Sequence, residues 1–326
     1  MAASKELHLI QRPDGMPRPD DFKLIETILP EPRENEVAVD NLYLSIDPAT
    51  RPRLTRGQEL GTTVMGFALG RVTQSRHKDF REGDIVQSAF GYRERFVADG
   101  KALRKITADS SLPLTVYMHV LGGAGFVAYG GLLEIGKMKP GETVFVSTAA
   151  GAVGSAAVQI AKLKGCTVIG STGSDDKADW LRSMGLDGVI NYKHAPIREA
   201  LRAAAPKGID VYFDNVGGEQ LEAALSCMNM LGRVAVCGMI STYNDQQTGV
   251  RNLSAIIYGR INIRGFVAPD FMQLQPQFVE EMTAWLKAGK VKYQETVFEG
   301  IENASAALIA LLNGENTGKM MVKLKA

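Results

Sequence analysis

Hydrophobic and polar residues follow one pattern at the start of the chain and another in its middle. Up to about residue 115, short runs rich in β-branched residues, such as EVAVDNLYLSID and VMGFALGRVTQS, are separated by Pro and Gly. Strands at this spacing are typical of a barrel or a sandwich. From Thr143, apolar runs such as TVFVS, TVIGST and GRVAVCG alternate with amphipathic stretches. Runs without polar alternation predict strands buried on both faces, and therefore a parallel sheet with helices on each side.

Helices are predicted between these apolar runs and again near the end of the chain. In the middle segment they span residues 154–164, 175–184, 197–204 and 219–229. The second of them has a start signal, Ser174 followed by two Asp residues, and a stop signal, Gly185. After about residue 265 we expect a helix over 276–288, a strand in YQETVFEG, a helix over 303–313 and a strand in KMMVKLKA. Roughly sixty residues of this kind could hardly form a third core, so the tail is expected to complete the N-terminal domain.

Length, charge and cysteine content limit the classes of function. A chain of 326 residues, 45% hydrophobic and 22% charged, is expected to form two domains. Its net charge of +1 favours neither nucleic acid nor an anionic membrane as a partner. The odd number of cysteines, Cys166, Cys227 and Cys237, fits a reducing cytoplasm, and their spacing fits no metal knuckle. We expect no signal peptide and no membrane span, because no apolar segment of about 18 residues occurs.

The stretch VFVSTAAGAVGSAAVQIAKLKG resembles a dinucleotide-binding turn that lacks one glycine. In a GxGxxG turn the three glycines allow a tight bend, close approach of a pyrophosphate, and close packing of helix and strand. Ala149, Gly151 and Gly154 occupy these places, and alanine is tolerated at the first if its φ stays negative. The following helix would direct its free N–H groups at the anion. The alternative is that these small residues serve only helix–strand packing.

The next apolar run indicates which nicotinamide cofactor would bind. An NAD site usually carries an acidic residue about 20 positions after the glycines. VIGSTGSDDK has no carboxylate where its strand ends, whereas Ser174 and Lys177 could bind a 2′-phosphate. We therefore predict NADP(H), with Asp175 and Asp176 pointing to solvent. The alternative is that Lys177 is an ordinary solvated helix lysine.

Other oxidoreductase chemistries lack their residues in this chain. Zinc needs thiolate and imidazole ligands, but no cysteine precedes residue 166, and His8, His77 and His119 show no ligand spacing. No tyrosine is followed by lysine four residues later, which is the spacing used by short-chain reductases. We therefore predict no catalytic metal. What remains is hydride transfer from a cofactor in a pocket with at most one protic side chain.

A set of motifs over nearly the whole chain resembles one known family. The motifs are LYLSIDPATR, GLLEIGKMKPGETVFVSTAAGAVGSAAVQIAKLKGC, GSDDKADWLRSMG, INYK, YFDNVGG, GRVAVCGMISTYN and GENTGKMMVKL. Together they are similar to the zinc-independent medium-chain dehydrogenase/reductases, in the branch of leukotriene B4 12-hydroxydehydrogenase, prostaglandin reductase and alkenal double-bond reductase. The resemblance implies an α/β protein with a GroES-like β-rich catalytic domain, residues 1–117 completed by 265–326, and an inserted Rossmann-type doubly wound parallel sheet domain, residues 118–264. It also implies a homodimer.

The resemblance also implies roles for individual residues. The pyrophosphate would meet the backbone of Gly151, Ala152, Val153 and Gly154, and the 2′-phosphate would lie among Ser174, Lys177 and Tyr192. Asn215 would lie near the nicotinamide-side ribose. The rest of the cofactor site would be closed by Cys237, Gly238, Met239, Ile240, Ser241, Tyr243, Phe266, Val267, Ala268 and Asn316. For Tyr192 and Asn215, strand-end packing and turn formation are the alternatives.

Tyr243 is the candidate catalytic residue. Reduction of a C=C bond conjugated to a carbonyl moves a hydride to the β-carbon and develops enolate charge on oxygen. A hydrogen-bond donor directed at that oxygen lowers the barrier by a few kcal/mol. The Tyr243 hydroxyl and the cofactor ribose hydroxyl are the expected donors, with solvent supplying the α-carbon proton. The alternative is that Tyr243 only lines the pocket wall.

The sequence departs from the family at three pocket positions. Val127 replaces a threonine expected to face the nicotinamide carboxamide, Ala49 replaces a tyrosine, and Phe67 stands in an otherwise glycine-rich run. These changes favour a hydrophobic enone or enal over an eicosanoid. Quinone reduction or allylic alcohol oxidation, and NADPH binding without turnover, remain as alternatives to enone reduction.

Overall fold

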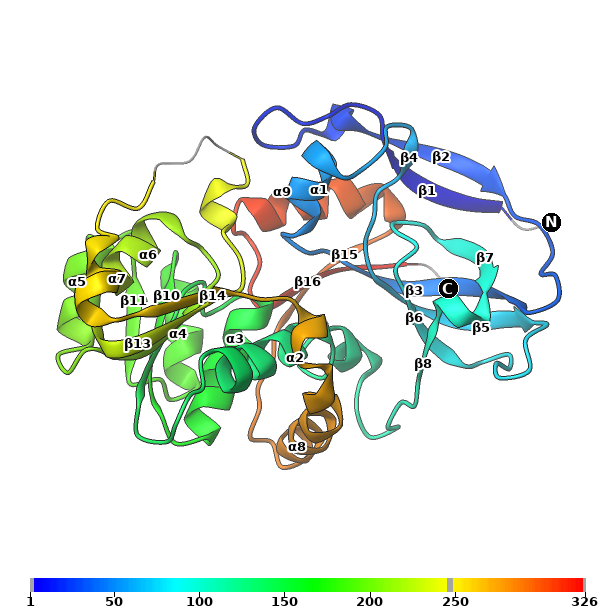
Figure 1. Cartoon of the computed structure of the whole chain (residues 1–326). Helices are drawn as coiled ribbons and strands as arrows, with labels where there is room; N and C mark the ends of the chain where they lie inside the picture. The colour runs from blue at the N-terminus through cyan, green and yellow to red at the C-terminus, as the bar shows by residue number, and fades with distance from the viewer. Residues whose placement is uncertain (1–2, 245–248, 325–326) are drawn as a thin grey trace. The chain divides into compact units, whose positions relative to one another are not determined.

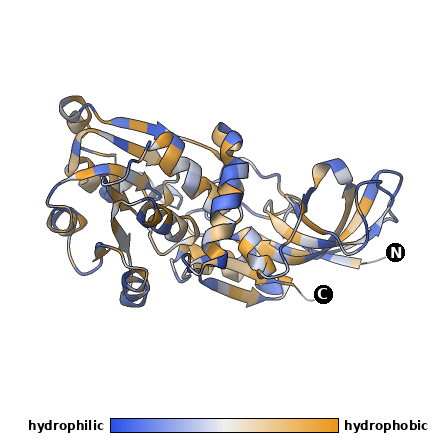
Figure 2. Ribbon diagram, turned by 90° about the horizontal axis from the view of Figure 1, so that it is seen from below, coloured by the Kyte–Doolittle hydropathy of each residue, from blue (hydrophilic) through white to orange (hydrophobic). Residues whose placement is uncertain are grey.

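The chain folds into two units, and the second is inserted into the first. In a computed structural model that describes residues 3–244 and 249–324, the first unit is Met1–Met118 with Glu295–Ala326, and the second is His119–Gln294 (Figure 1). Hydrophobic and hydrophilic residues are interspersed along most strands and helices (Figure 2), as expected where each element has a buried and an exposed side.

The first unit is rich in β-structure. One sheet has the order β2-β1-β4, and a larger one has the order β15-β16-β3-β5-β6-β8, with β7 also paired to β3. The strands are β1 (Ala3–Leu9), β2 (Phe22–Ile28), β3 (Glu36–Ser45), β4 (Thr62–Thr63), β5 (Ala68–Ser75), β6 (Ile85–Ser88), β7 (Arg95–Asp99), β8 (Arg104–Ile106), β15 (Glu295–Glu299) and β16 (Lys319–Lys323), with helices α1 (Thr50–Arg56) and α9 (Ala304–Leu312). Short 3₁₀ turns occur at η1 (Pro19–Asp21), η2 (Gly100–Ala102), η3 (Leu114–Met118) and η7 (Ile301–Asn303).

The C-terminal segment is part of the core of the first unit. β16 pairs antiparallel with β3, so that Met321 lies opposite Ser45. Leu308 of α9 and Val322 of β16 are fully buried and belong to one hydrophobic cluster with Leu9 of β1. Burial of this apolar surface ties the two ends of the chain together.

The second unit is a doubly wound parallel sheet, as the apolar runs predicted. Its order is β11-β10-β9-β12-β13-β14, and every neighbouring pair is parallel. The strands are β9 (Thr143–Val146), β10 (Thr167–Thr172), β11 (Gly188–Asn191), β12 (Ile209–Asp214), β13 (Met228–Val236) and β14 (Asn262–Gly265). Because the chain moves outward from β9 to β11 and then returns to β12, the strand order reverses between β9 and β12. In open α/β sheets ligands bind at such a switch point, outside the carboxyl ends of the strands.

The helices of the second unit pack on this sheet or on one another. They are α2 (Gly123–Gly130), α3 (Ala152–Leu163), α4 (Asp175–Ser183), α5 (Ile197–Ala204), α6 (Gly218–Leu225), α7 (Ser254–Gly259) and α8 (Gln275–Lys287), with shorter turns η4 (Gly131–Ile135), η5 (Ile240–Thr242) and η6 (Ala268–Leu274). α5 and α6 pack together, and their buried residues form one cluster with Phe145 and Tyr212 of the sheet. α3 packs against β9, β10 and α2.

Two expectations about element positions were wrong. The helix predicted over 219–229 ends at Leu225, because β13 begins at Met228, which lies opposite Ile209. Residues 265–294, assigned from the sequence to the first unit, belong to the second. The physical reason is aromatic packing: Phe271 and Phe278 are buried against Phe126 of α2, with ring centroids 5.1 and 5.4 Å away.

Among the helices within residues 3–244 and 249–324, none combines the length and the apolar character that crossing a membrane requires.

Candidate functional site

The predicted binding segments of the second unit lie at one edge of its sheet. Thr148 comes shortly after β9, Gly173 after β10, Asn215 after β12 and Cys237 after β13. Because all four strands are parallel, these residues meet at the carboxyl edge, on both sides of the switch point. The fold therefore brings together segments that lie up to about ninety residues apart in the sequence.

The turn after β9 is built differently from the expectation. Thr148, not Ala149, adopts a left-handed conformation, with φ of 49°. The Ala149 side chain is fully buried, and its N–H donates to the carbonyl of Ser171 on β10 at 2.9 Å. Alanine is thus tolerated in the first glycine position because the preceding residue makes the bend.

The two remaining glycines allow close approach of the chain to itself. A Cβ on Gly154 would lie 2.2 Å from the carbonyl oxygen of Thr148, so only glycine lets α3 pack this closely on the turn. Gly151 is the N-cap of α3 and provides no side-chain cap, so the first N–H groups of this 12-residue helix are available to an anion. Gly154 thus serves helix packing, whereas Gly151, Ala152 and Val153 present backbone.

A basic cluster lies after β10. The Tyr192 hydroxyl packs over Gly173, 2.6 Å from where a Cβ on that glycine would be, and the Lys193 side chain comes within 3.6 Å of the same point. Burial lowers the pKa of Lys177, and the positive charge of Lys193 lowers it further. Burial raises the pKa of Tyr192, so the phenol stays protonated and can donate a hydrogen bond. Ser174 is the N-cap of α4, but its side chain makes no capping bond. Lys193 was not among the predicted site residues, although it follows Tyr192 directly in INYK.

Asp175, the first of the two carboxylates that follow Ser174, has partners of its own. Asp175 accepts a hydrogen bond from the Asn191 side chain at 2.9 Å and pairs with His194 at 3.4 Å. Its side chain is 67% exposed, in agreement with the expectation that it points to solvent. An exposed carboxylate opposes a bound phosphate less than a buried one would, because water screens its charge.

The segment after β13 carries Tyr243. Met239 donates its N–H to the Tyr243 hydroxyl oxygen at 3.5 Å, so the phenol lies back over the backbone of its own segment. Burial raises the pKa of Tyr243, which keeps its O–H proton in place as a donor. Ser241 is exposed, and Cys237, Gly238 and Ile240 are half-buried. Burial, together with the charge of Asp214, raises the pKa of Cys237 to about 12, so this thiol is no nucleophile.

Asn215, at the switch point, makes hydrogen bonds that stabilise the fold. Its side-chain amide donates to the carbonyl of Ser147 at 2.7 Å, and its backbone N–H donates to the Ser147 hydroxyl at 2.9 Å. These bonds join the end of β12 to the end of β9. Turn formation is therefore one role of Asn215, which leaves its amide oxygen for a ligand.

The other predicted residues divide between the two units. Phe266 packs against Phe213 and Phe271, with ring centroids 6.0 and 5.8 Å away, while Val267 is 61% exposed and Ala268 begins η6. Asn316 belongs to the first unit, where it is buried and donates to the carbonyl of Gly318 at 2.8 Å. Its predicted contact with a cofactor stays a prediction.

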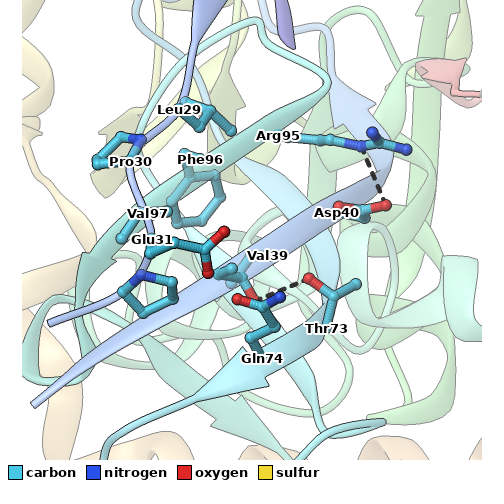
Figure 3. Close-up of a pocket in the computed structure, with 12 residues that line it drawn as sticks. Leu29, Pro30, Glu31, Val39, Asp40, Thr73, Gln74, Arg95, Phe96 and Val97 are labelled. Atoms are coloured by element: carbon cyan, nitrogen blue, oxygen red, sulfur yellow. Dashed lines mark hydrogen bonds and ion pairs between the residues drawn. The ribbon is translucent and has the colours of Figure 1, made fainter. Parts of the chain in front are cut away.

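Two small hollows lie elsewhere and contain none of the predicted site residues. One, of about 70 Å³, lies in the first unit beside the Asp40–Arg95 ion pair and the Phe96 ring (Figure 3). The other, of about 180 Å³, lies in the second unit and is lined by Gln159, Lys162, Leu163, Ser183, Met184, Lys290 and Lys292. Both are smaller than the few hundred Å³ typical of ligand pockets.

Metal ligands do not gather in the described residues. Within 3–244 and 249–324, no group of three or more His, Cys, Asp or Glu side chains could hold a metal ion. His8, for example, pairs with Glu6 at 3.3 Å. The absence of a catalytic metal stays a prediction.

Comparison with known proteins adds to this geometry. Residues 5–106 match a family model described as an N-terminal domain of oxidoreductase, and residues 152–287 match one described as a zinc-binding dehydrogenase. Prostaglandin reductase 1 of Bos taurus is 42% identical, over 95% of each chain. The NADP(+)-dependent 2-alkenal reductase of Nicotiana tabacum is 41% identical, over 98% of this chain and 97% of its own.

A solved structure is similar over almost its whole length. The structure of CurA from Vibrio vulnificus in complex with NADPH superposes with a TM-score of 0.93 at 34% identity, covering 99% of each chain. The strand order, the glycine turn and the relatives all agree with the sequence motifs. The chain belongs to the prostaglandin reductase and alkenal reductase branch of the medium-chain dehydrogenase/reductases.

Proposed function

We propose that this protein is an NADPH-dependent reductase of the C=C bond in hydrophobic α,β-unsaturated ketones or aldehydes. The main support for NADPH as the cofactor is the set of residues at the carboxyl edge of the second unit's sheet. It joins an uncapped helix N-terminus at Gly151 to the basic cluster around Gly173. An N–H-rich turn suits a pyrophosphate, and two lysines with a protonated phenol suit a 2′-phosphate. Relatives named 2-alkenal reductase, pulegone reductase and prostaglandin reductase support the class of substrate.

The residues at this edge fit NADPH, and their proposed role is to bind and orient it. NADPH, when bound, supplies the hydride for the substrate β-carbon. Residues 151–154 would hold its pyrophosphate, and Ser174, Lys177, Tyr192 and Lys193 its 2′-phosphate. Like charge from Lys193 lowers the pKa of Lys177, and a bound phosphate would relieve that repulsion.

Tyr243 is proposed as the catalytic residue. Its raised pKa keeps the phenol protonated, and its oxygen accepts a long hydrogen bond from the Met239 N–H, at 3.5 Å. The O–H group can therefore donate to the substrate carbonyl oxygen as enolate charge develops there. A cofactor ribose hydroxyl is the second proposed donor, and solvent supplies the α-carbon proton.

Steady-state NADPH oxidation with a panel of enones, enals, quinones and saturated carbonyls tests this function. We expect turnover of enones and enals, with the product saturated at C=C. Turnover of quinones alone, or tight NADPH binding without oxidation, would contradict the proposal. Metal analysis of the active protein tests the zinc-independent chemistry.

Tyr243→Phe tests the catalytic residue. We expect kcat for enones to fall about tenfold or more with little change in NADPH affinity, because a transition-state donor is lost. Tyr43→Phe removes the hydroxyl of a half-buried tyrosine in β3 that is not a predicted site residue, and it is the matched control. Equal kcat in the wild type and Tyr243→Phe would assign Tyr243 to the pocket wall.

We further propose a homodimer formed through the edge strand β14. β14 pairs only with β13 among the described strands, and all four of its residues are exposed. Next to it in the chain, Leu253, Ile257 and Tyr258 are 52%, 73% and 82% exposed. A second copy of β14 could pair antiparallel across a twofold axis, satisfying the open edge of both sheets and burying these side chains.

Light scattering after size exclusion tests the dimer. Ile263→Lys puts a charge on the exposed edge of β14, and we expect it to produce monomers. Ile28→Lys, at a 58% exposed position in the first unit, is the control and should leave the assembly unchanged. A monomeric wild type at assay concentration would contradict the proposal.

A cytoplasmic location is also proposed, because all three cysteines are free.

A further inference from the structure

Asp214 is a buried carboxylate at the switch point of the second sheet. It is the last residue of β12 and has no exposed surface. Its Oδ1 atom accepts hydrogen bonds from the Tyr212 hydroxyl at 2.6 Å, the Ser147 hydroxyl at 3.4 Å, and the N–H groups of Val216 and Gly217 at 2.9 and 2.8 Å. All these donors are neutral. Four bonds on one oxygen fix the orientation of the carboxylate.

The second oxygen of this carboxylate differs from the first. Oδ2 is buried and has no hydrogen-bond partner among the described residues. Burial raises the pKa of Asp214, and the hydrogen bonds that it accepts offset only part of the loss of hydration. Buried polar atoms without partners are rare and costly, so this arrangement calls for a reason beyond packing.

The same residue anchors two loops that carry predicted site residues. The Asp214 carbonyl accepts the N–H groups of Cys237 and Gly238 at 2.8 and 3.1 Å, which fixes where the segment leading to Tyr243 begins. The next residue, Asn215, accepts the N–H of Ile240 at 3.3 Å through its carbonyl. The start of both loops therefore depends on the end of β12.

The network also reaches the strand that leads to the glycine turn. Ser147 lies one residue before Thr148 and contacts Asp214, Tyr212 and Asn215 through its hydroxyl. One carboxylate thus links the ends of β9 and β12 and holds the turn that carries Asn215. Movement of this group would displace residues on both sides of the switch point.

We propose that Asp214 is a positioning residue for hydride transfer. Through Ser147, Tyr212 and the turn N–H groups it fixes Asn215 and the segment of Tyr243 relative to the glycine turn. This inference rests on the proposed function, because it assumes that the cofactor binds at this edge. Misplacement of reacting groups by about 1 Å can cost about a hundredfold in rate, so a group that does not touch the substrate can still limit kcat.

Asp214→Ala, with Asp214→Asn as the conservative variant, tests the proposal. We expect kcat per folded molecule to fall about a hundredfold in Asp214→Ala. The Kd of NADPH should change much less, because the pyrophosphate and 2′-phosphate sites are made by other residues. Asp214→Asn keeps an acceptor at the Oδ1 position and should restore most of kcat. With NADPH deuterated at the transferred position, the isotope effect should rise in Asp214→Ala as hydride transfer becomes slower.

Asp210 provides a matched control on the same strand. It lies near the other end of β12, where its carboxylate accepts the N–H of Thr143 and the side chain of Asn229, both at 2.8 Å. Asp210→Ala should lower the unfolding temperature and leave kcat per folded molecule unchanged. Loss of stability alone would act alike in both variants, whereas a positioning role affects kcat only in Asp214→Ala.

The kinetic results of these variants and of the wild type decide the outcome. The inference is overturned if kcat of Asp214→Ala stays near the wild-type value, or if Asp210→Ala lowers it equally. If Asp214→Ala does not fold, Ser147→Ala and Tyr212→Phe replace it, and unchanged kcat in both overturns the inference. If no enone or enal supports NADPH oxidation by the wild type, the proposed function fails and this inference fails with it, whereas an unchanged kcat in Asp214→Ala overturns the inference alone.

Discussion

Two aspartates, the partly exposed Asp47 of the first unit and the buried Asp214 of the second, show opposite electrostatics. Asp47, just after β3, accepts a hydrogen bond from the Lys319 ammonium at 2.9 Å, and that ammonium also donates to the carbonyl of Ile46 at 2.8 Å. Burial alone would raise the pKa of Asp47, but Lys319 and the hydrogen bond from Ser45 hold it below its usual value. Asp214 has only neutral donors, and its pKa is raised.

The difference between the surroundings of Asp47 and Asp214 separates charges that stabilise the fold from charges available to a ligand. Lys319 is 2% exposed in its side chain and lies in β16, so its pairing with Asp47 joins the tail to the first part of the chain. In the second unit, Lys177 has a like charge, Lys193, beside it, and the hydrogen bonds that the Asp214 carboxylate accepts within the described residues come from neutral donors. Charges paired within the chain stabilise a fold, whereas perturbed groups at a sheet edge are typical of functional sites.

The largest expected effect on stability comes from breaking the ion pair between Asp47 and Lys319 in the first unit. Asp47→Asn leaves the Lys319 ammonium buried without its anion and should lower the free energy of unfolding by about 2 to 3 kcal/mol, below the full cost of a broken buried pair because Asp47 is partly exposed. Hydrogen exchange during urea unfolding, read on peptides of the first unit, measures it. Asp179→Asn breaks an exposed ion pair with Arg182 and should cost much less. Equal losses of unfolding free energy in Asp47→Asn and Asp179→Asn would contradict the stabilising role of the Asp47–Lys319 pair.

A smaller effect is expected from the like-charged pair in the second unit. Lys177→Ala should weaken NADPH binding about tenfold, because a charge-assisted bond to the 2′-phosphate is lost. The affinity for NADH, which lacks that phosphate, should barely change. Titration with both cofactors measures the difference, and Lys207→Ala, at an exposed position, is the control. Equal weakening for both cofactors would remove the 2′-phosphate assignment.

The smallest expected effect is in the pH dependence of stability. The folded pKa of Asp47 lies below 3.8, so its contribution is present above that value and is lost as pH falls. The folded pKa of Asp214 lies above 3.8, so its contribution is present at low pH and is lost as pH rises. The destabilisation by Asp47→Asn should therefore grow between about pH 3 and about pH 7, and that by Asp214→Asn should shrink.

Urea unfolding across this pH range measures the two slopes. Trp180 and Trp285 both lie in the second unit, so their fluorescence follows Asp214→Asn, while hydrogen exchange follows the first unit. If the destabilisation changed with pH in the same direction in both variants, the proposed difference between Asp47 and Asp214 would be wrong.

Much of the second unit could be predicted because its signals are local. Apolar runs located the strands, and the helix over 197–204 has the predicted bounds. The end of α6 could not be predicted, because Met228 and Asn229 suit a helix until β13 pairs with β12. The assignment of residues 265–294 failed for a related reason, since Phe271 and Phe278 pack against α2, which is distant in sequence.

The sequence by itself determined the class of fold, the family and the glycine turn, because periodicity and small residues act over a few neighbouring positions. Only the tertiary structure decided that Thr148 makes the bend, that Lys193 joins Lys177, and that neutral donors hold the buried Asp214 whereas Lys319 pairs with Asp47. Each of these depends on strands far apart in the chain meeting at one edge, and the pKa of a carboxylate depends on what surrounds it.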